Sequence, residues 1–103
     1  MPYPTYEEIC MLGSTGKTLT LKARCLWRSP YSFIDARIVD VFDPEEMYHA
    51  LPCGQMASQY IDGLPIHGKI YLALSYDGKM IQQWFFLADL EDGVILGRNV
   101  LNQ

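Results

Sequence analysis

The hydrophobic pattern of this chain predicts many short strands and few helices. Polar and apolar residues alternate from position 18 to 24, which is typical of a strand with one buried face. The run from 32 to 41 is rich in Ile, Val and Phe and also favours a strand, broken by a loop at Asp35. Asp-Gly pairs at 62–63 and 77–78 separate apolar runs and predict two tight hairpins.

Two short helices are expected beside these strands. Thr5 and Glu8 have the form of a capping box before the apolar residues 9–12, so the segment 1–17 is interpreted as an N-terminal extension with a short helix. Asp43 and Pro44 suit the start of a second helix that runs to Leu51. The pattern as a whole predicts one mainly β domain over residues 1–103, a small closed β barrel-like fold with short helices.

The composition excludes several classes of protein. The chain has 103 residues, 8 basic and 12 acidic side chains and a net charge of -4, so it has too few cations for a nucleic-acid partner. No apolar stretch approaches the roughly 18 residues that cross a membrane, and the first residues do not resemble a signal peptide. Three widely spaced cysteines favour a reducing, intracellular location, cytoplasmic or nuclear.

Two possible ligand sites are rejected on spacing. Residues 14–18, Ser-Thr-Gly-Lys-Thr, hint at a phosphate-binding loop, but its first glycine would fall at Met11. The cysteines and histidines show no spacing that is typical of a metal site. We therefore expect neither a metal nor another cofactor.

Four segments, in order along the chain, carry a resemblance to a known family. They are Ile34-Asp35, the segment 42–51, the segment 60–70 with Asp-Gly at its centre, and Val-Ile-Leu-Gly-Arg-Asn-Val-Leu at 94–101. From about position 19 to the end, the chain resembles the retropepsins, the half-sized aspartic proteases of retroviruses and LTR retrotransposons. The Ty3/gypsy type is the most similar, and the last motif is the most specific of the four.

The resemblance implies a role for each segment. Asp35 stands at the position of the catalytic aspartate, because a flap hairpin must fit between that residue and the final motif. The flap would comprise Tyr60, Ile61, Asp62, Gly63 and Leu64. The final motif, Gly97, Arg98 and Asn99, would support the catalytic loop, with Arg98 paired to Asp40. Retropepsins are homodimers with one aspartate per subunit. They continue into a strand after the last helix that joins the subunits, whereas this sequence ends at Gln103, so we expect another surface to form the dimer.

The catalytic triplet departs from the family pattern of Asp-Ser/Thr-Gly, because here it is Asp35-Ala36-Arg37. Ala36 lacks the hydroxyl that locks the two catalytic loops together across the dimer axis. Arg37 replaces a glycine that leaves room for the backbone. If its guanidinium points at Asp35, it favours the ionised carboxylate and removes the proton that two aspartates share. If it points outward, the strand can run straight through.

Two functions follow from the resemblance. The first is a catalytically inactive domain, derived from a retrotransposon protease, that works as a homodimerisation or protein-interaction module. The second is an active aspartic endopeptidase, in which Asp35 and its symmetry mate activate a water molecule. The expected partners are a second copy of the chain and a peptide or protein. The loss of both the hydroxyl and the glycine favours the first.

Overall fold

The computed structural model describes residues 5–47, 49–51 and 60–103. Short strands and helices follow one another along these residues: β1 (Thr5–Leu12), β2 (Thr18–Cys25), β3 (Ser32–Asp35), α1 (Ala36–Phe42), α2 (Pro44–Met47), β4 (Tyr60–Ile61), β5 (Leu64–Tyr76), β6 (Lys79–Ala88), β7 (Val94–Leu96) and α3 (Arg98–Leu101). No helix among them is long and apolar enough to cross a membrane.

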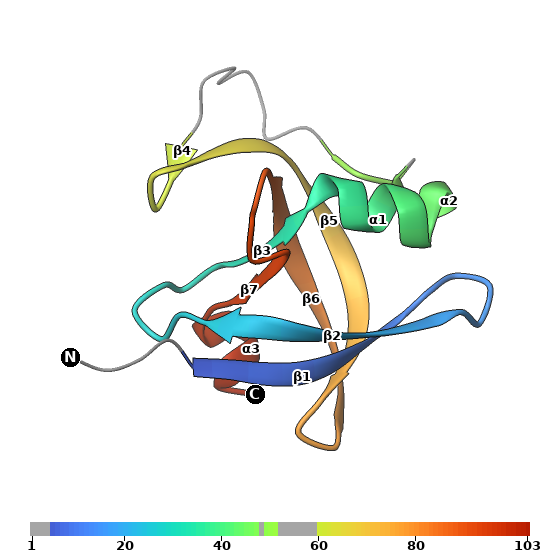
Figure 1. Cartoon of the computed structure of the whole chain (residues 1–103), viewed down its shortest axis with the longest axis horizontal. Coiled ribbons are helices and arrows are strands. Elements are labelled where there is room, and N and C mark those ends of the chain that lie inside the picture. Colours follow the sequence, from blue (N-terminus) through green and yellow to red (C-terminus); the bar gives the residue numbers. More distant parts are fainter. Residues whose placement is uncertain (1–4, 48, 52–59) are drawn as a thin grey trace.

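The strands form one closed barrel. They are ordered β1-β2-β7-β3-β6-β5-β4, and a further antiparallel pairing of β1 with β5 closes the ring (Figure 1). The long β5 and β6 pair from Ile66 to Tyr76, with an irregularity between Ile66 and Gly68. This arrangement confirms the predicted fold class, a mainly β closed barrel with short helices.

The chain repeats one topology twice. The unit β2–loop–β3–α1 and the unit β6–loop–β7–α3 each contain two strands, a loop between them and a helix after the second strand. The units interlock, because β7 lies between β2 and β3, and β3 lies between β7 and β6. The pairs β2–β7 and β3–β6 are parallel, whereas β3 and β7 are antiparallel. Asp35 in the first unit and Gly97 in the second both lie between a strand and the helix that follows.

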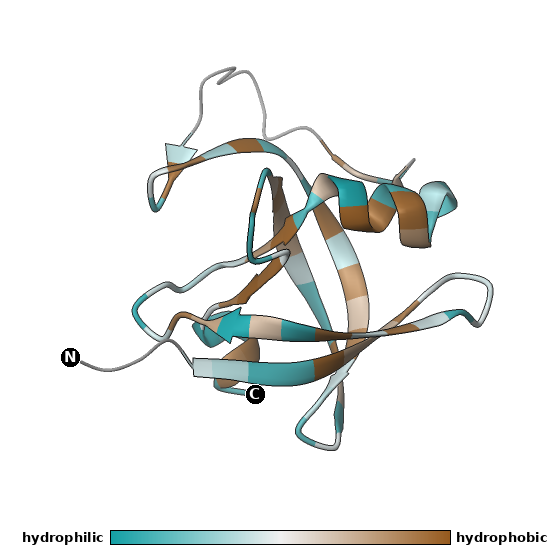
Figure 2. Ribbon diagram, in the orientation of Figure 1, coloured by the Kyte–Doolittle hydropathy of each residue, from teal (hydrophilic) through white to brown (hydrophobic). Residues whose placement is uncertain are grey.

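The core lies inside the barrel and under α1. Brown and pale bands alternate along β5 in Figure 2, as expected for a strand with one buried face. Ile34 and Phe85 are almost fully buried there, and Val39 of α1 packs in the same cluster. Phe33 is equally buried in a second cluster, with Ile66, Ala88, Leu90 and Ile95. Each buried aromatic or branched side chain stabilises the fold by about 1.5–3 kcal/mol relative to an exposed one.

The predicted N-terminal helix is wrong. Residues 5–12 form β1, which pairs with β2 along its whole length. The capping-box pattern of Thr5 and Glu8 is a local signal, whereas the buried side chains in this segment are Ile9 and Met11, two residues apart. Burial at a period of two and pairing with two neighbouring strands outweigh a cap worth about 1 kcal/mol.

The strand predicted from 32 to 41 is also wrong in its second half. β3 ends at Asp35, and α1 begins at Ala36. The β-branched composition of this segment favours a strand. However, the apolar residues Val39 and Phe42 are three apart, which places both on the same helical face toward the core.

The second expected helix is shorter than predicted. α2 ends at Met47, and Leu51 instead forms an isolated bridge with Lys69 of β5. The carboxylate of Asp43 accepts hydrogen bonds from the Ser14 amide at 2.7 Å and from the Ser14 hydroxyl at 3.0 Å. These bonds lower the pKa of Asp43, the Ser14 amide most of all. They tie the β1–β2 turn to the end of α1.

Candidate functional site

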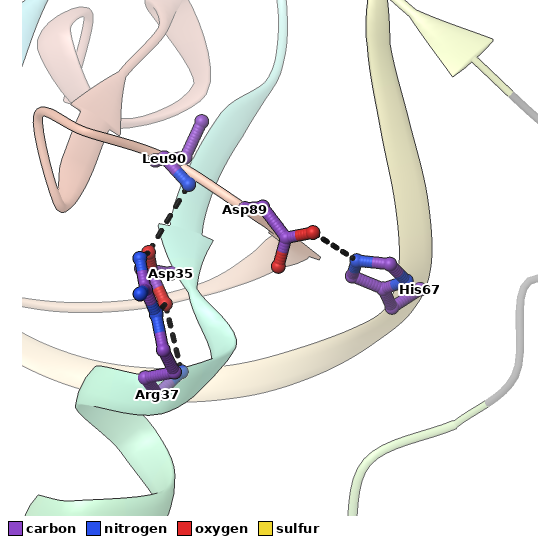
Figure 3. Close-up of polar contacts among 5 residues, drawn as sticks. All are labelled: Asp35, Arg37, His67, Asp89 and Leu90. Atoms are coloured by element: carbon purple, nitrogen blue, oxygen red, sulfur yellow. Dashed lines mark hydrogen bonds and ion pairs between the residues drawn. The ribbon is translucent and has the colours of Figure 1, made fainter.

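Asp35 is the buried carboxylate of the expected catalytic position. It is the last residue of β3 and the N-cap of α1, and only 2% of its surface is exposed. Its Oδ1 accepts hydrogen bonds from the Arg37 amide at 2.8 Å and from Arg37 Nε at 3.0 Å. Its Oδ2 accepts from Arg37 Nη2 at 2.7 Å and from the Leu90 amide at 3.1 Å (Figure 3). Both oxygens are therefore occupied by donors of the same chain.

These donors hold the pKa of Asp35 far below its ordinary value. The hydrogen bonds from the Arg37 side chain make the largest contribution. Burial opposes them by raising the pKa, and the amides of Arg37 and Leu90 lower it further. These contacts therefore favour the ionised form of the carboxylate.

The sequence leaves two orientations open for Arg37, and the structure shows the inward one. Its guanidinium folds back onto Asp35, although 77% of the side chain is exposed. The strand does not run through, because α1 starts at Ala36, whose methyl group packs against the core. The bidentate contact is possible because the first turn of the helix brings the amide and the side chain of residue 37 to the same carboxylate.

A contact between a histidine and a carboxylate lies beside this ion pair and was not expected from the sequence. His67 Nε2 of β5 is 3.2 Å from Asp89 Oδ2, in the segment that follows β6. Figure 3 shows Asp89 between His67 and the Asp35–Arg37 pair. The pKa of Arg37 is raised mainly by its hydrogen bonds to Asp35 and by the charge of Asp35, and the charge of Asp89 adds a smaller contribution. Asp89 directly precedes Leu90, whose amide binds Asp35. No spacing in the sequence relates residues 67 and 89, since their contact depends on how β5 pairs with β6.

The expected flap is a hairpin. β4 and the start of β5 pair around a tight turn, in which Asp62 has a φ of 51° and Gly63 a φ of 80°. Positive φ at both positions is what an Asp-Gly turn of this type requires. The hydroxyl of Ser29 donates to Asp62 Oδ2 at 2.5 Å. The tip of the hairpin is therefore tied to the loop between β2 and β3, at the opposite end of β3 from Asp35.

That loop is a site that sequence reasoning missed. Residues 26–31 read Leu-Trp-Arg-Ser-Pro-Tyr and contain no carboxylate. Ser29 is 1% exposed, and its hydroxyl donates to Asp62 at the hairpin tip while its oxygen accepts from the Tyr31 amide at 3.1 Å. The hairpin tip and Gly97 both contact this loop, whereas Asp35 lies at the other end of β3. The catalytic role of Asp35 and the flap role of residues 60–64 stay predictions. The carboxylate of Asp62 is the acidic group that binds this loop.

The final motif acts mainly through its backbone and through Asn99. A Cβ atom at Gly97 would collide with the carbonyl group of Tyr31 and lie 2.8 Å from the Ser29 carbonyl oxygen. The Gly97 amide donates to Ser32 Oγ at 2.9 Å, and Ser32 Oγ donates to Asn99 Oδ1 at 2.5 Å. Only a glycine allows α3 to approach the first loop this closely, so its role as a support has a steric cause.

The expected ion pair between Arg98 and Asp40 is not formed. Both side chains are exposed, and Arg98 contributes its backbone amide, which donates to the Ser29 carbonyl at 2.8 Å. The ion pairs among the described residues join other groups. The acid expected to receive Arg98 lies on α1, and the helical turn after Asp35 directs Asp40 to the surface.

A pocket of about 510 Å³ opens beside Asp35. It lies between β2, α1 and the loop before β7, and it is lined by Leu19, Leu21, Asp35, Arg37, Ile38, Val41, Phe42, Leu90, Glu91 and Gly93. Most of these side chains are apolar, and the Asp35–Arg37 pair with Glu91 supplies the charges. The pocket can therefore accept apolar groups next to an ion pair that is already satisfied.

The two described cysteines are free thiols. Cys10 is half-buried and Cys25 is buried, and burial raises the pKa of Cys25, with a smaller contribution from Glu7. The third cysteine, Cys53, lies outside the described residues. Among residues 5–47, 49–51 and 60–103, no group of three or more His, Cys, Asp or Glu side chains gathers as metal ligands.

Comparison with known proteins supports the fold. No family model matches the chain, and no curated protein matches it. Among solved structures, the chain is similar to the retroviral protease-like domain of Ddi1 from Leishmania major, with a TM-score of 0.74 and 15% sequence identity. The match covers 99% of this chain and 78% of that chain. The fold is therefore retropepsin-like, as the resemblance implied.

Proposed function

We propose that this chain is a catalytically inactive retropepsin-like domain that works as a homodimerisation or protein-interaction module derived from a retrotransposon protease. One observation carries the proposal. Both carboxylate oxygens of Asp35 are bound by Arg37 and Leu90 of the same chain. If Asp35 is the catalytic residue, as the family resemblance implies, its carboxylate must be free to exchange a proton with its symmetry mate and with water.

Electrostatics add to this argument. Two Asp35 carboxylates brought together in a dimer would each carry an arginine, so each would stay ionised. Neither could then act as the acid that protonates a departing amine. Ala36 also lacks a hydroxyl that could hold two such loops together.

The loop at the hairpin tip supports the same conclusion. Ser29 binds Asp62 there, and residues 26–31 hold no acid of their own. A substrate held beneath the hairpin would therefore meet Trp27, Arg28 and Ser29 rather than a pair of carboxylates.

The alternative is an active aspartic endopeptidase. The observation that favours it is the pocket of about 510 Å³, which is lined by Asp35 and has room for a substrate side chain. In this alternative, a bound peptide would displace Arg37 from Asp35, which is conceivable because the guanidinium is mostly exposed.

A cleavage assay separates the two. A diverse peptide library is incubated with the purified protein from about pH 4 to 7, with Asp35→Asn as the test variant and Asp40→Asn as the matched control on the exposed side of α1. Our proposal predicts no cleavage by any of the three proteins. Cleavage that disappears in Asp35→Asn and persists in Asp40→Asn would establish the endopeptidase.

A restoration experiment tests the stated cause. The double substitution Ala36→Ser and Arg37→Gly returns the triplet to the family pattern. If Arg37 is what blocks chemistry at Asp35, the double variant gains cleavage that Asp35→Asn removes again. A folded double variant that does not cleave would point to the loop 26–31 as the lesion.

A further inference from the structure

The second strand of the barrel has an open edge. β2 pairs with β1 along its full length, whereas β7 covers its other edge only at Arg24 and Cys25. Among the described ranges 5–47, 49–51 and 60–103, no strand pairs with that edge from Thr18 to Lys22. Five consecutive residues thus form an incomplete sheet edge.

The main-chain groups of this edge point outward. The Leu26 amide donates to the Leu96 carbonyl at 2.8 Å, on the β7 side of β2. Alternate residues of a strand direct their amide and carbonyl to the same side. Every second residue before Leu26 has the same orientation. The amides and carbonyls of Thr18, Thr20 and Lys22 therefore point to the open edge. Their side chains are exposed, and no described strand pairs with these amide and carbonyl groups.

The open edge borders the apolar pocket. Leu19 and Leu21 of β2 line the pocket that α1 and the loop before β7 enclose on its other sides. Val41 of α1 also lines it, and at 83% exposure it is the most exposed of the large apolar side chains among the described residues. Hydrogen-bonding groups along one strand and an apolar pocket beside it are the two elements of recognition by strand addition.

We infer that an extended peptide segment of a partner protein, with alternating apolar and acidic residues, binds as an added strand along Thr18–Lys22 and places its apolar side chains in this pocket. The inference rests on the proposed function, since it names the partner of a non-catalytic module. The main chain of the segment would bind the three outward amide and carbonyl pairs, and the pocket would select the side chains that face it.

The charges of β2 favour an acidic partner over a second copy of this chain. Lys22 projects from the exposed face, Lys17 lies just before the strand, and β2 contains no acidic residue. Glu8 of β1 lies opposite Lys22 on one side, and a carboxylate on the incoming strand would lie on the other. A second copy of β2 would bring its own Lys22 and Lys17 close to these lysines, and lysines on an edge disfavour self-pairing.

Binding of defined peptides tests the inference on the whole chain. The probe is fluorescein-labelled Glu-Val-Glu-Leu-Glu-Val-Glu, and the control is the same peptide with Lys in place of each Glu. We expect the acidic peptide to bind more tightly than the basic one. We also expect it to slow the hydrogen exchange of the amides of Thr18, Thr20 and Lys22, because those amides gain a partner.

Two variants of the edge make the test specific. Thr20→Pro removes an outward amide without breaking a bond to β1, since proline is tolerated where the missing N–H faces solvent. We expect it to weaken binding about five- to tenfold, and we expect Thr20→Ala, which keeps the amide, to bind within about twofold of the unmodified protein. Lys22→Glu should reverse the preference between the acidic and basic peptides.

Each outcome has one meaning. Equal binding by the Thr20→Pro and Thr20→Ala variants, or no binding of the acidic peptide, would overturn the added strand. Light scattering that shows Thr20→Pro to separate a dimer, with peptide binding unchanged, would overturn it in favour of a second copy. Mass spectrometry of the same samples monitors the peptides themselves. Cleaved peptide would contradict the proposed function, whereas intact and unbound peptide would contradict only this inference.

Discussion

A single carboxylate, Asp35, links the sequence of this chain to its proposed function. It ends a strand, caps a helix and binds Arg37 in a bidentate contact. In an aspartic protease the same group would have to be exchangeable. Position 37 decides whether the carboxylate is bound or exchangeable. An arginine there, in the first turn of the helix, reaches back to the carboxylate, whereas a glycine has no side chain to do so.

Substitution of Asp35 gives a pH-dependent prediction. Its pKa is lower in the folded chain than in the unfolded chain, where it is about 3.9. Its stabilising contribution is therefore fully present above about pH 4 and is lost as the pH falls through the folded value. We expect Asp35→Asn to lower the free energy of unfolding by about 1–2 kcal/mol at pH 7 and by less at pH 3, in urea titrations.

Asp40→Asn is the control for this effect, since Asp40 is exposed on the same helix. It should change stability by less than about 0.5 kcal/mol at either pH. An equal loss at pH 3 and pH 7 for Asp35→Asn would show that the ion pair contributes nothing and that only the shape of the side chain matters.

Gly97 makes a second prediction at the residue scale. Its own backbone, with a φ of -98°, suits any residue, so the need for glycine is steric. We expect Gly97→Ala to destabilise the fold by about 2–3 kcal/mol, because the added methyl group meets the Tyr31 carbonyl. Gly78→Ala, at a φ of 74° with open space around it, should cost only about 1 kcal/mol of backbone strain. Thermal unfolding of both variants checks the order, and the reverse order would refute the steric account.

At the scale of elements, the Asn99 side chain fastens α3 to two strands. Asn99 accepts a hydrogen bond from Ser32 of β3 and donates to the Trp84 carbonyl of β6 at 3.2 Å. It thus joins the helix to two neighbouring strands of the sheet. We expect Asn99→Ala to destabilise the protein by about 1–3 kcal/mol, because it leaves the buried Ser32 hydroxyl without its acceptor. Asn102→Ala, at the exposed end of α3, should be neutral in the same denaturant titration, and a matching loss there would contradict this role.

The elements also show what the sequence could predict. The hairpins at 62–63 and 77–78 could be predicted because their Asp-Gly pairs suit positive φ, which all four residues adopt. The helix α1 could not be predicted, because its Ile and Val residues favour a strand locally. Only the packing of Val39 and Phe42 on the core favours a helix. The strand β1 could not be predicted either, since its pairing with β2 and β5 depends on distant residues.

In the candidate site too, contacts between sequence neighbours could be predicted and contacts between distant residues could not. That Arg37 could bind Asp35 could be anticipated, because the two lie close in sequence. The bonds from Leu90 to Asp35 and from Ser29 to Asp62 join residues far apart in the chain, so they depend on the barrel itself. The pairing of Arg98 with Asp40 was inferred from a family resemblance, and the helix after Asp35 removes it.

At the scale of the whole molecule, the interlocked repeat places the two units of the barrel against each other. β3 and β7 lie at the centre of the sheet, each flanked by strands of the other unit. Their buried residues, such as Phe33, Ile34 and Val94, do not depend on a catalytic group. The barrel therefore rests mainly on this apolar core.

Oligomeric state is the prediction that belongs to this scale. A homodimerisation module should elute as a dimer in light scattering at micromolar concentration and should dissociate on dilution with a concentration-dependent melting temperature. The Arg37→Gln variant should remain a dimer, since the proposal assigns Arg37 to its own Asp35 and not to the interface. A mass that corresponds to a monomer at every concentration would contradict homodimerisation. Only the protein-interaction hypothesis would then remain.

The measurement that tests the central claim most directly is the titration of the Asp35 carboxyl carbon by NMR, from about pH 2 to 8, in the unmodified protein and in Arg37→Gln. We predict that the signal of the unmodified protein shows an ionised carboxylate throughout the range from pH 4 to 7, and that Arg37→Gln moves the transition upward toward the ordinary aspartate value. A transition between pH 4 and 7 in the unmodified protein, as expected for two carboxylates that share a proton, would contradict the account and restore Asp35 as a working catalytic group.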